Sequence, residues 1–259
     1  MSTGKAGGGP VTRIATSDAT SIHVGGKNLI EDLIGMHTYT EMLYFLTVKR
    51  MPTPLQTRIL DGCLVTLMEH GLTPSAVIAR LMADSVPEEP QVAMAAGLLA
   101  IGSVFAGTTE QCAQLLLDLE KRIAHGENDA PRKVALEYAA AKKPVPGFGH
   151  TTHKPDDPRS ASLFKVVERD GQKSRYVDLL RQLAVEVDTA NGRHITINAT
   201  GAMGALFLEI GIPVEAMRGF SVVARSGGLV GHLIEEKETH SGRAIWMASR
   251  AAVRYEEPQ

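Results

Sequence analysis

The feature that most constrains the fold of this 259-residue chain is an eighteen-residue segment that interrupts an otherwise helical pattern. Residues 142–159 read KKPVPGFGHTTHKPDDPR, and four prolines with two glycines cannot continue a helix. A long loop inside a compact helical protein is typically functional or disordered. Because this loop also carries histidine, lysine, arginine and aspartate side chains, we predict that it is functional.

Apolar residues recur at spacings of three and four on both sides of this loop, a pattern typical of amphipathic helices. Two short β-type runs, at residues 12–14 and 22–24, predict a small N-terminal hairpin. We expect the almost wholly apolar segment 92–101 to be a buried helix. The predicted helices cover residues 55–68, a segment that begins at 73–75, and residues 92–101, 109–123, 131–143, 174–187, 202–210 and 214–236.

The composition narrows the class of protein. Lys and Arg total 27 against 29 Asp and Glu, which gives a net charge of −2. This charge argues against a nucleic-acid partner, because proteins that bind nucleic acids typically have a basic domain. Hydrophobic residues at 44% and charged residues at 22% exclude a disordered chain. Aromatic residues are only 5% while glycines number 25, which favours closely packed helices over a β-sandwich.

The cysteines and the first residues of the sequence indicate in which cellular compartment the protein is expected. Cys63 and Cys112 fall inside apolar helical patterns, so we predict buried thiols in a reducing environment and no disulfide. No stretch reaches the roughly 18 uninterrupted apolar residues of a membrane span. Residues 1–10 are Gly-rich and polar and lack the apolar core of a signal peptide, so we expect a cytoplasmic protein.

The loop residues suit a small anionic substrate. Gly147 and Gly149 let the backbone approach a ligand closely, and His150 can exchange a proton near neutral pH. Lys154 and Arg159 can neutralise phosphate or carboxylate groups, arginine through a bidentate fork. A solvated surface loop whose charges pair locally remains the alternative.

A metal site is a second alternative for this loop. His150 and His153 could ligate a metal together with an aspartate. The spacing is loose and neither a cysteine nor a third histidine is near in the sequence. We therefore expect no metal and no tightly bound cofactor.

The loop resembles the signature of the citrate synthase superfamily, through Val145-Pro146-Gly147-Phe148-Gly149-His150, Lys154 and Asp157-Pro158-Arg159. That superfamily also includes citryl-CoA lyases and the C-terminal module of ATP-citrate lyase. The resemblance spans roughly residues 12 to 248, and the length is closer to short lyase-type members than to full-length citrate synthases. Four further stretches agree: 30–34, 41–44 with Pro52-Thr53-Pro54, Met68-Glu69-His70-Gly71 with Ser75, and Ala224-Arg225 through Gly228, His232 and Glu235.

The resemblance implies roles for four side chains. His70 would contact the head of the oxo acid or citrate. His150 would hydrogen-bond the oxygen at the carbon where the C–C bond is made or broken. Arg159 and Arg225 would clamp the substrate carboxylates. From the residues alone, His70 could instead cap helix carbonyls or face water, and Arg225 could pair with a buried acid.

The resemblance also implies a coenzyme A site, in which loop backbone recognises the adenine and cations bind phosphate. The second such cation would be Arg193, five residues before Asn198. An arginine from the partner subunit completes the family's site, and Arg243 is the candidate. The coenzyme A set is therefore Val145, Pro146, Gly147, Phe148, Gly149, Lys154, Arg193 and Asn198.

Two positions depart from the family pattern. Phe105 stands where the synthases place a histidine, and a phenyl ring cannot polarise a thioester carbonyl, although the ATP-citrate lyase module resembles this chain there. Thr200 stands where the catalytic aspartate is expected after Asn198. A threonine hydroxyl is no useful base at neutral pH. Positioned acid–base groups contribute about 10²–10⁴-fold to the reaction rate, so their loss is expected to slow a synthase.

The fold implied by the resemblance is all-α and citrate synthase-like, with the minor N-terminal hairpin. A large helical domain would comprise residues 1–105 and 203–259, with a small helical domain of residues 106–202 inserted between them. The active site would lie in the cleft, and its closure would exclude water. A homodimer is the smallest expected assembly, because the family shares its site across subunits.

The function implied is a carbon–carbon lyase that cleaves a citryl-CoA-like or other 3-hydroxyacyl-CoA thioester by a retro-aldol reaction. The alternatives are a citrate or methylcitrate synthase-type condensation, and a catalytically weakened coenzyme A-binding module. The partners would be an acyl-CoA and a small carboxylic acid, such as acetyl-CoA and oxaloacetate. We expect no nucleic-acid or membrane partner.

Overall fold

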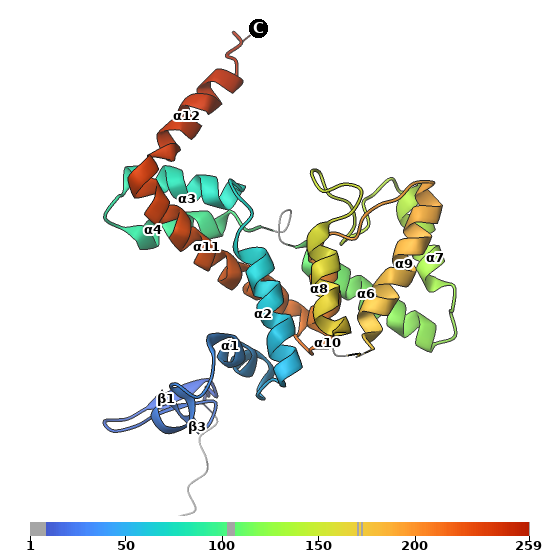
Figure 1. The fold of residues 1–259 in the computed structure, drawn as a ribbon, viewed down its shortest axis with the longest axis horizontal. Coiled ribbons are helices and arrows are strands. Elements are labelled where there is room, and N and C mark those ends of the chain that lie inside the picture. Colours follow the sequence, from blue (N-terminus) through green and yellow to red (C-terminus); the bar gives the residue numbers. More distant parts are fainter. Residues whose placement is uncertain (1–8, 103–106, 170, 172, 259) are drawn as a thin grey trace, which may run out of the picture. The chain divides into compact units, whose positions relative to one another are not determined.

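The computed structural model describes residues 9–102, 107–169, 171 and 173–258, and most of them are helical (Figure 1). The all-α class predicted from the sequence is therefore confirmed. The chain divides into two compact units, Met1–Thr57 and Arg58–Gln259. The division predicted from the sequence, with residues 106–202 as an inserted small domain, is a different one and stays a prediction.

The first unit contains a three-stranded antiparallel sheet in the order β1 (Ala15–Ser17), β2 (Ile22–Val24) and β3 (Lys27–Asn28). The predicted hairpin is present, but its first strand lies at 15–17 and the prediction of 12–14 was wrong. In the turn between β1 and β2, Asp18 Oδ1 accepts the backbone N–H groups of Thr20 and Ser21 at 2.8 Å. This turn fixes the strand register in which Ser17 lies opposite Ile22.

Two helical segments follow the sheet in the first unit. The π-helical turn η1 (Leu29–Leu33) is capped by the Asn28 side chain. Helix α1 (Tyr39–Val48) begins with a capping box, in which Thr38 and Glu41 each bind the other's backbone N–H. The chain then enters α2 (Pro54–Met68), which agrees with the predicted helix at 55–68.

In the second unit, one group of helices consists of α3 (Pro74–Ser85), α4 (Pro90–Leu99), α11 (Met217–Thr239) and α12 (Ser241–Ala252). Small side chains let these helices approach closely, as the glycine-rich, aromatic-poor composition predicts. A Cβ on Gly97 of α4 would lie 2.7 Å from the Ser75 carbonyl oxygen of α3. The core of this group is Ala76, Ala79, Ala93, Leu229 and Leu233.

The other group in the second unit surrounds α10 (Ala199–Glu209), which is almost entirely buried. Helix α10 packs against α6, α8 and α9, and α7 packs against α9 (Figure 1). The short turn η2 (Val214–Ala216) then leads into α11. The bounds of the four surrounding helices are Thr108–Ala124 for α6, Ala130–Ala140 for α7, Pro158–Glu168 for α8 and Arg175–Asn191 for α9.

Several helix boundaries differ from the sequence-based prediction. Helix α8 begins at Pro158, inside the segment predicted as a loop, because the Asp157 side chain caps it by accepting the Arg159 N–H. Helix α12 was not predicted. Helix α4 is not wholly buried, since Leu99 is 86% exposed.

Both cysteines are buried and free, as predicted. Burial raises the pKa of the Cys63 thiol and raises that of Cys112 to about 12. Among the residues that the structure describes, no helix has the length and apolar character needed to cross a bilayer.

The glycine-rich part of the loop lies against the start of α10. Gly149 donates its N–H to the Thr196 carbonyl at 2.8 Å, and Asn198 donates its N–H to the Gly147 carbonyl at 3.0 Å. Gly147 has a φ of +87°, and a Cβ there would lie 2.6 Å from Cys112 Sγ and 2.7 Å from the Gly201 Cα. Glycine is therefore required where the loop crosses α10.

Replacing Gly201 by alanine should lower stability, because the added methyl group would force the loop away from α10. We expect the free energy of unfolding to fall by about 1–3 kcal/mol, the usual cost of overpacking. The matched control is Gly231→Ala in α11, where a Cβ meets nothing within 4 Å. This control should be neutral or stabilising by up to about 1 kcal/mol, as for Gly→Ala in a helix. Chemical denaturation measures both, and equal stabilities would contradict the close approach.

Candidate active site

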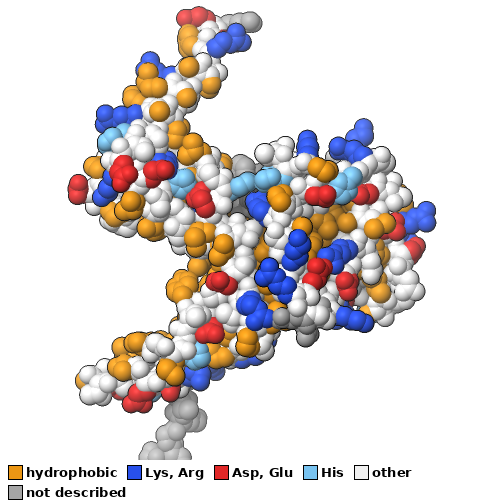
Figure 2. Space-filling model, viewed as in Figure 1, with side chains coloured by type: hydrophobic (Ala, Val, Ile, Leu, Met, Phe, Trp, Pro, Cys, Tyr) orange, Lys and Arg blue, Asp and Glu red, His pale blue; other side chains and the backbone are white. Residues whose placement is uncertain are grey.

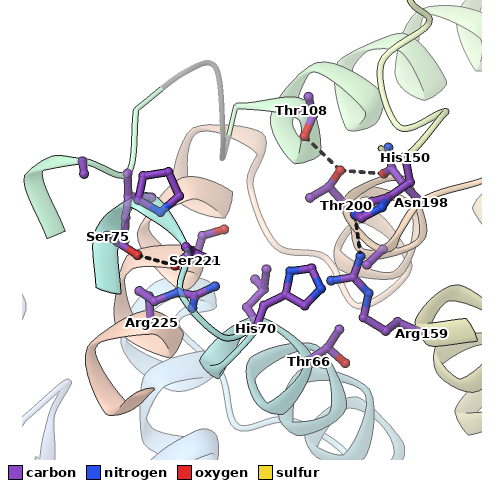
Figure 3. A pocket seen from close by; sticks show the side chains of 16 residues that line it. Thr66, His70, Ser75, Thr108, His150, Arg159, Asn198, Thr200, Ser221 and Arg225 are labelled. Atoms are coloured by element: carbon purple, nitrogen blue, oxygen red, sulfur yellow. Dashed lines mark hydrogen bonds between the residues drawn. The ribbon is translucent and has the colours of Figure 1, made fainter. Parts of the chain in front are cut away.

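A cavity of about 320 Å³ in the second unit brings together residues that are far apart in the sequence (Figure 3). It lies where α2, α3, α6, α10 and α11 meet the loop before α8. Six residues predicted from the sequence line it: His70, His150, Arg159, Asn198, Thr200 and Arg225.

Three histidine rings form a cluster at this site. Histidine side chains reach the surface on the face drawn in Figure 2. The rings of His150 and His153 are stacked with centroids 4.4 Å apart, and His70 lies 6.0 Å from His150 and 5.5 Å from His153. In Figure 3 the His70 ring points into the space between Arg159 and Arg225.

His150 is held as a hydrogen-bond donor toward the cavity. Its Nδ1 accepts the backbone N–H groups of Thr152 at 3.1 Å and His153 at 2.9 Å. The neutral ring therefore carries its proton on Nε2. Nε2 lies 3.2 Å from Nη2 of Arg159, so a ligand oxygen beside this pair could accept a hydrogen bond from both nitrogen atoms.

Both cavity histidines favour the neutral form. Burial and then the charges of His153 and Arg159 lower the pKa of His150 below its usual value of 6.5. Burial also lowers the pKa of His70, and Arg159, His153 and Arg225 add to the effect. At neutral pH the two rings can therefore donate or accept a proton without starting charged.

Arg159 is oriented by a buried carboxylate. Its Nε and Nη2 donate to the two oxygens of Asp157 at 2.9 and 2.8 Å. Asp157 is 1% exposed, and its carboxylate also accepts the backbone N–H groups of Arg159 and Ala199. Burial opposes the charge, but these hydrogen bonds lower the pKa of Asp157 overall. Arg159 is thus fixed at the cavity wall.

Arg225 brings a second guanidinium to the cavity from α11. Its side chain is 13% exposed, and its closest acid is Glu69, with Nη1 4.0 Å from Oε1. Nη1 is buried and has no hydrogen-bond partner among the described residues. A buried unpaired guanidinium N–H is costly, so a ligand carboxylate is the natural partner for it.

Thr200 takes the place where the family pattern expects an aspartate. Its hydroxyl donates to Asn198 Oδ1 at 2.7 Å and accepts from the Thr108 hydroxyl at 2.9 Å (Figure 3). Asn198 caps α10 and donates its Nδ2–H to the Gly149 carbonyl at 2.8 Å. The Thr200 hydroxyl is therefore part of the helix cap and is not a base.

A network of polar side chains next to the cavity includes Glu69, His232 and Arg80. Glu69 Oε1 accepts the backbone N–H groups of His70 and Gly71, and its Oε2 lies 3.0 Å from His232 Nε2. His232 Nδ1 accepts from Arg80 Nε at 2.9 Å. Arg80 is 3% exposed and also binds Glu236 at 2.9 Å, Ser241, and Glu235.

Other predicted site residues lie outside the cavity lining. The backbone of Val145–Gly149 lies beside it, along the start of α10, whereas Lys154 and Arg193 are exposed on the surface. Arg243 lines a separate cavity of about 350 Å³ and pairs with Asp84 at 3.0 Å. Phe105 lies outside the described residues.

Several residues of the site were not predicted from the sequence. Thr66, Thr108 and Ser221 add hydroxyl groups to the cavity lining, and nothing in their local sequence distinguishes them. Arg80 was also missed, although a charged residue on the apolar face of α3 is a signal for a buried ion pair. Among the described residues, no group of three or more His, Cys, Asp or Glu could hold a metal ion.

The sequence and the fold were compared with known proteins. A family model described as "Citrate synthase, C-terminal domain" matches residues 12–248. A citrate synthase of Synechocystis sp. is 28% identical over 203 residues, which cover 76% of this chain and 49% of that protein. The chain spans about half or less of the length of the curated relatives that it matches.

Two solved structures share the fold over nearly the whole chain. A citryl-CoA lyase from Hydrogenobacter thermophilus has a TM-score of 0.85 at 26% identity, with 96% of this chain and 95% of that chain covered. An ATP citrate lyase from Methanothrix soehngenii, in complex with citrate and coenzyme A, has a TM-score of 0.79 at 18% identity. The match covers 98% of this chain and 43% of the ATP citrate lyase chain.

Replacing Asp157 by asparagine should destabilise the protein at neutral pH by about 1.5–3 kcal/mol, the worth of hydrogen bonds to a charged group. The pKa of Asp157 is lowered from 3.8 in the folded protein. Its stabilisation is therefore complete above pH 3.8 and is lost as the pH falls through the folded pKa.

The matched control is Asp156→Asn, since Asp156 has an exposed side chain whose one ion pair among the described residues is with the half-exposed His194. We expect it to change stability by less than about 0.5 kcal/mol. Urea unfolding between pH 3 and pH 7 measures both variants. A wild type no more stable than Asp157→Asn at pH 7 would contradict the assigned role.

Proposed function

The chain belongs to the citrate synthase family, and we propose that it is a carbon–carbon lyase that cleaves a citryl-CoA-like thioester by a retro-aldol reaction. The observation that carries this proposal is the meeting of His150, Arg159 and Arg225 in one cavity whose described lining contains no carboxylate. Two guanidinium groups and one N–H donor at a lining without a carboxylate favour an anionic substrate.

The similarity to a citryl-CoA lyase of solved structure supports a lyase over a condensing synthase. This chain and the Hydrogenobacter citryl-CoA lyase match over nearly their full lengths. A synthase must remove a proton from the weakly acidic methyl carbon of acetyl-CoA, which requires a positioned base. Thr200, at the expected aspartate position, has a hydroxyl engaged in a helix cap and cannot serve.

Each cavity residue has a task in the cleavage that follows from its geometry. The guanidinium groups of Arg159 and Arg225 hold two substrate carboxylates and thereby orient the scissile bond. Nε2–H of His150 donates to the tertiary hydroxyl oxygen, which becomes the carbonyl oxygen of the oxo acid. Such a preorganised donor stabilises charge that develops on this oxygen in the transition state.

The reaction is balanced without a cofactor or redox step. A base removes the hydroxyl proton, the C–O bond becomes a carbonyl, and the C–C bond breaks. The electron pair goes to the carbon next to the thioester, and this enolate takes up one proton. From citryl-CoA the products are acetyl-CoA and oxaloacetate.

The coenzyme A moiety would lie along the loop at Val145–Gly149, whose backbone is fixed against α10. Lys154 and Arg193 are exposed cations and would bind the phosphates. A homodimer, in which Arg243 of the partner subunit reaches the site, belongs to the same proposal. So does an inserted domain of residues 106–202 that closes over the substrate.

The purified protein should convert citryl-CoA into acetyl-CoA and oxaloacetate in equal amounts, as followed by mass spectrometry. In a parallel reaction, acetyl-CoA or propionyl-CoA with oxaloacetate should release no free thiol. Thiol release would favour a citrate or methylcitrate synthase. Coenzyme A binding without either reaction would favour a binding module, and related 3-hydroxyacyl-CoA thioesters complete the panel.

Arg159→Lys and Arg225→Lys should each lower kcat/KM for the cleaved thioester on the order of 10²-fold, because lysine lacks the bidentate fork. The control is Arg181→Lys, which alters a partly exposed arginine that pairs with Glu168 far from the cavity lining. Steady-state kinetics and melting temperatures measure all three. Equal losses in the control, or none in the two cavity variants, would contradict the carboxylate clamp.

A further inference from the structure

The proposed cleavage needs a group that accepts the hydroxyl proton, and the described cavity lining offers few. It contains no Asp, Glu, Lys, Tyr or Cys, and its two groups that titrate near neutrality are His70 and His150. His150 is excluded as the base because Nδ1 already accepts two backbone N–H groups and Nε2 carries the proton. His70 is left.

His70 has one ring nitrogen engaged and one available. Its Nε2 lies 3.4 Å from Nε2 of His153, so one ring can donate to the other. Among the described residues, Nδ1 of His70 has no hydrogen-bond partner. The His70 backbone is anchored by Glu69, whose Oε1 accepts the His70 N–H at 2.8 Å. The ring is therefore held between the substrate space and His153.

His153 connects this ring to the outside. It is half-buried, does not line the cavity, and stacks on His150 with an interplanar angle of 29°. It thus contacts the cavity only through His70 and His150, and it also meets solvent. Its ring therefore lies between the cavity histidines and solvent.

We propose that His70 and His153 form a two-imidazole relay that carries a proton between the cavity and solvent, an inference that rests on the proposed lyase function. Nδ1 of His70 takes the hydroxyl proton as the C–C bond breaks. The proton on Nε2 of His70 passes to Nε2 of His153, and His153 releases its Nδ1 proton to water. Proton exchange with water after product release returns both rings to their starting tautomers. The enolate carbon takes one proton from water, so no net proton is gained or lost.

The charges around His70 are compatible with this task. Arg159, His153 and Arg225 lower the pKa of His70, Asp157 raises it, and the His150 ring lies 6.0 Å away. The positive groups outweigh the carboxylate, and burial acts in the same direction. His70 therefore begins the cycle neutral, with a lone pair ready to accept the proton.

The relay is tested with His153→Gln, which keeps a hydrogen-bonding side chain but cannot pass a proton. We expect kcat for citryl-CoA cleavage to fall at least about tenfold, within the range of acid–base contributions, with KM unchanged. His153→Ala should lose activity similarly and regain it when free imidazole is added. The control is His125→Gln, at the exposed end of α6, which should behave as wild type.

Each outcome separates the relay from the function on which it rests. A wild type that leaves citryl-CoA intact overturns the lyase proposal and the relay together. An active wild type matched in kcat by His153→Gln overturns the relay alone. A raised KM, a lowered melting temperature and no imidazole rescue would show that His153 has only a structural role, and would also overturn the relay.

Discussion

The buried carboxylate of Asp157 is the interaction on which the site depends. It joins three parts of the second unit: it caps α8, binds the guanidinium of Arg159 through both oxygens, and accepts the Ala199 N–H at the start of α10. Its own N–H donates to Thr196, in the segment that pairs with the glycine-rich loop. One ionised group thus fixes the loop, the helix and the arginine together.

The charge distribution in the cavity then determines its chemistry. The acids near it are used for positioning: Asp157 orients Arg159, and Glu69 holds the backbone of His70 and Gly71. The donors of His150, Arg159 and Arg225 face the open space. This arrangement stabilises negative charge on a ligand and leaves acid–base work to imidazole rings, which are effective near neutral pH.

Local patterns in the sequence predicted most of the helices and the long loop, but not α8 or α12. The six cavity residues were predicted from the resemblance to the citrate synthase superfamily. The loop was recognisable because prolines and glycines exclude a helix there. Helix α8 was not predicted, and it begins inside the predicted loop because the Asp157 side chain caps it. The acidic partners of Arg80 and the Thr108–Thr200 hydrogen bond could not be predicted, since the paired residues lie 155, 156 and 92 positions apart in the sequence and no periodicity encodes such contacts. The ring orientation of His153 likewise depends on tertiary packing.

The most direct test of this account is a crystal structure of the protein soaked with citrate and coenzyme A. The account predicts that Arg159 and Arg225 each bind a citrate carboxylate, with the tertiary hydroxyl oxygen at hydrogen-bonding distance from Nε2 of His150. Citrate bound elsewhere, such as in the cavity beside Arg243, with these three side chains unoccupied, would contradict it.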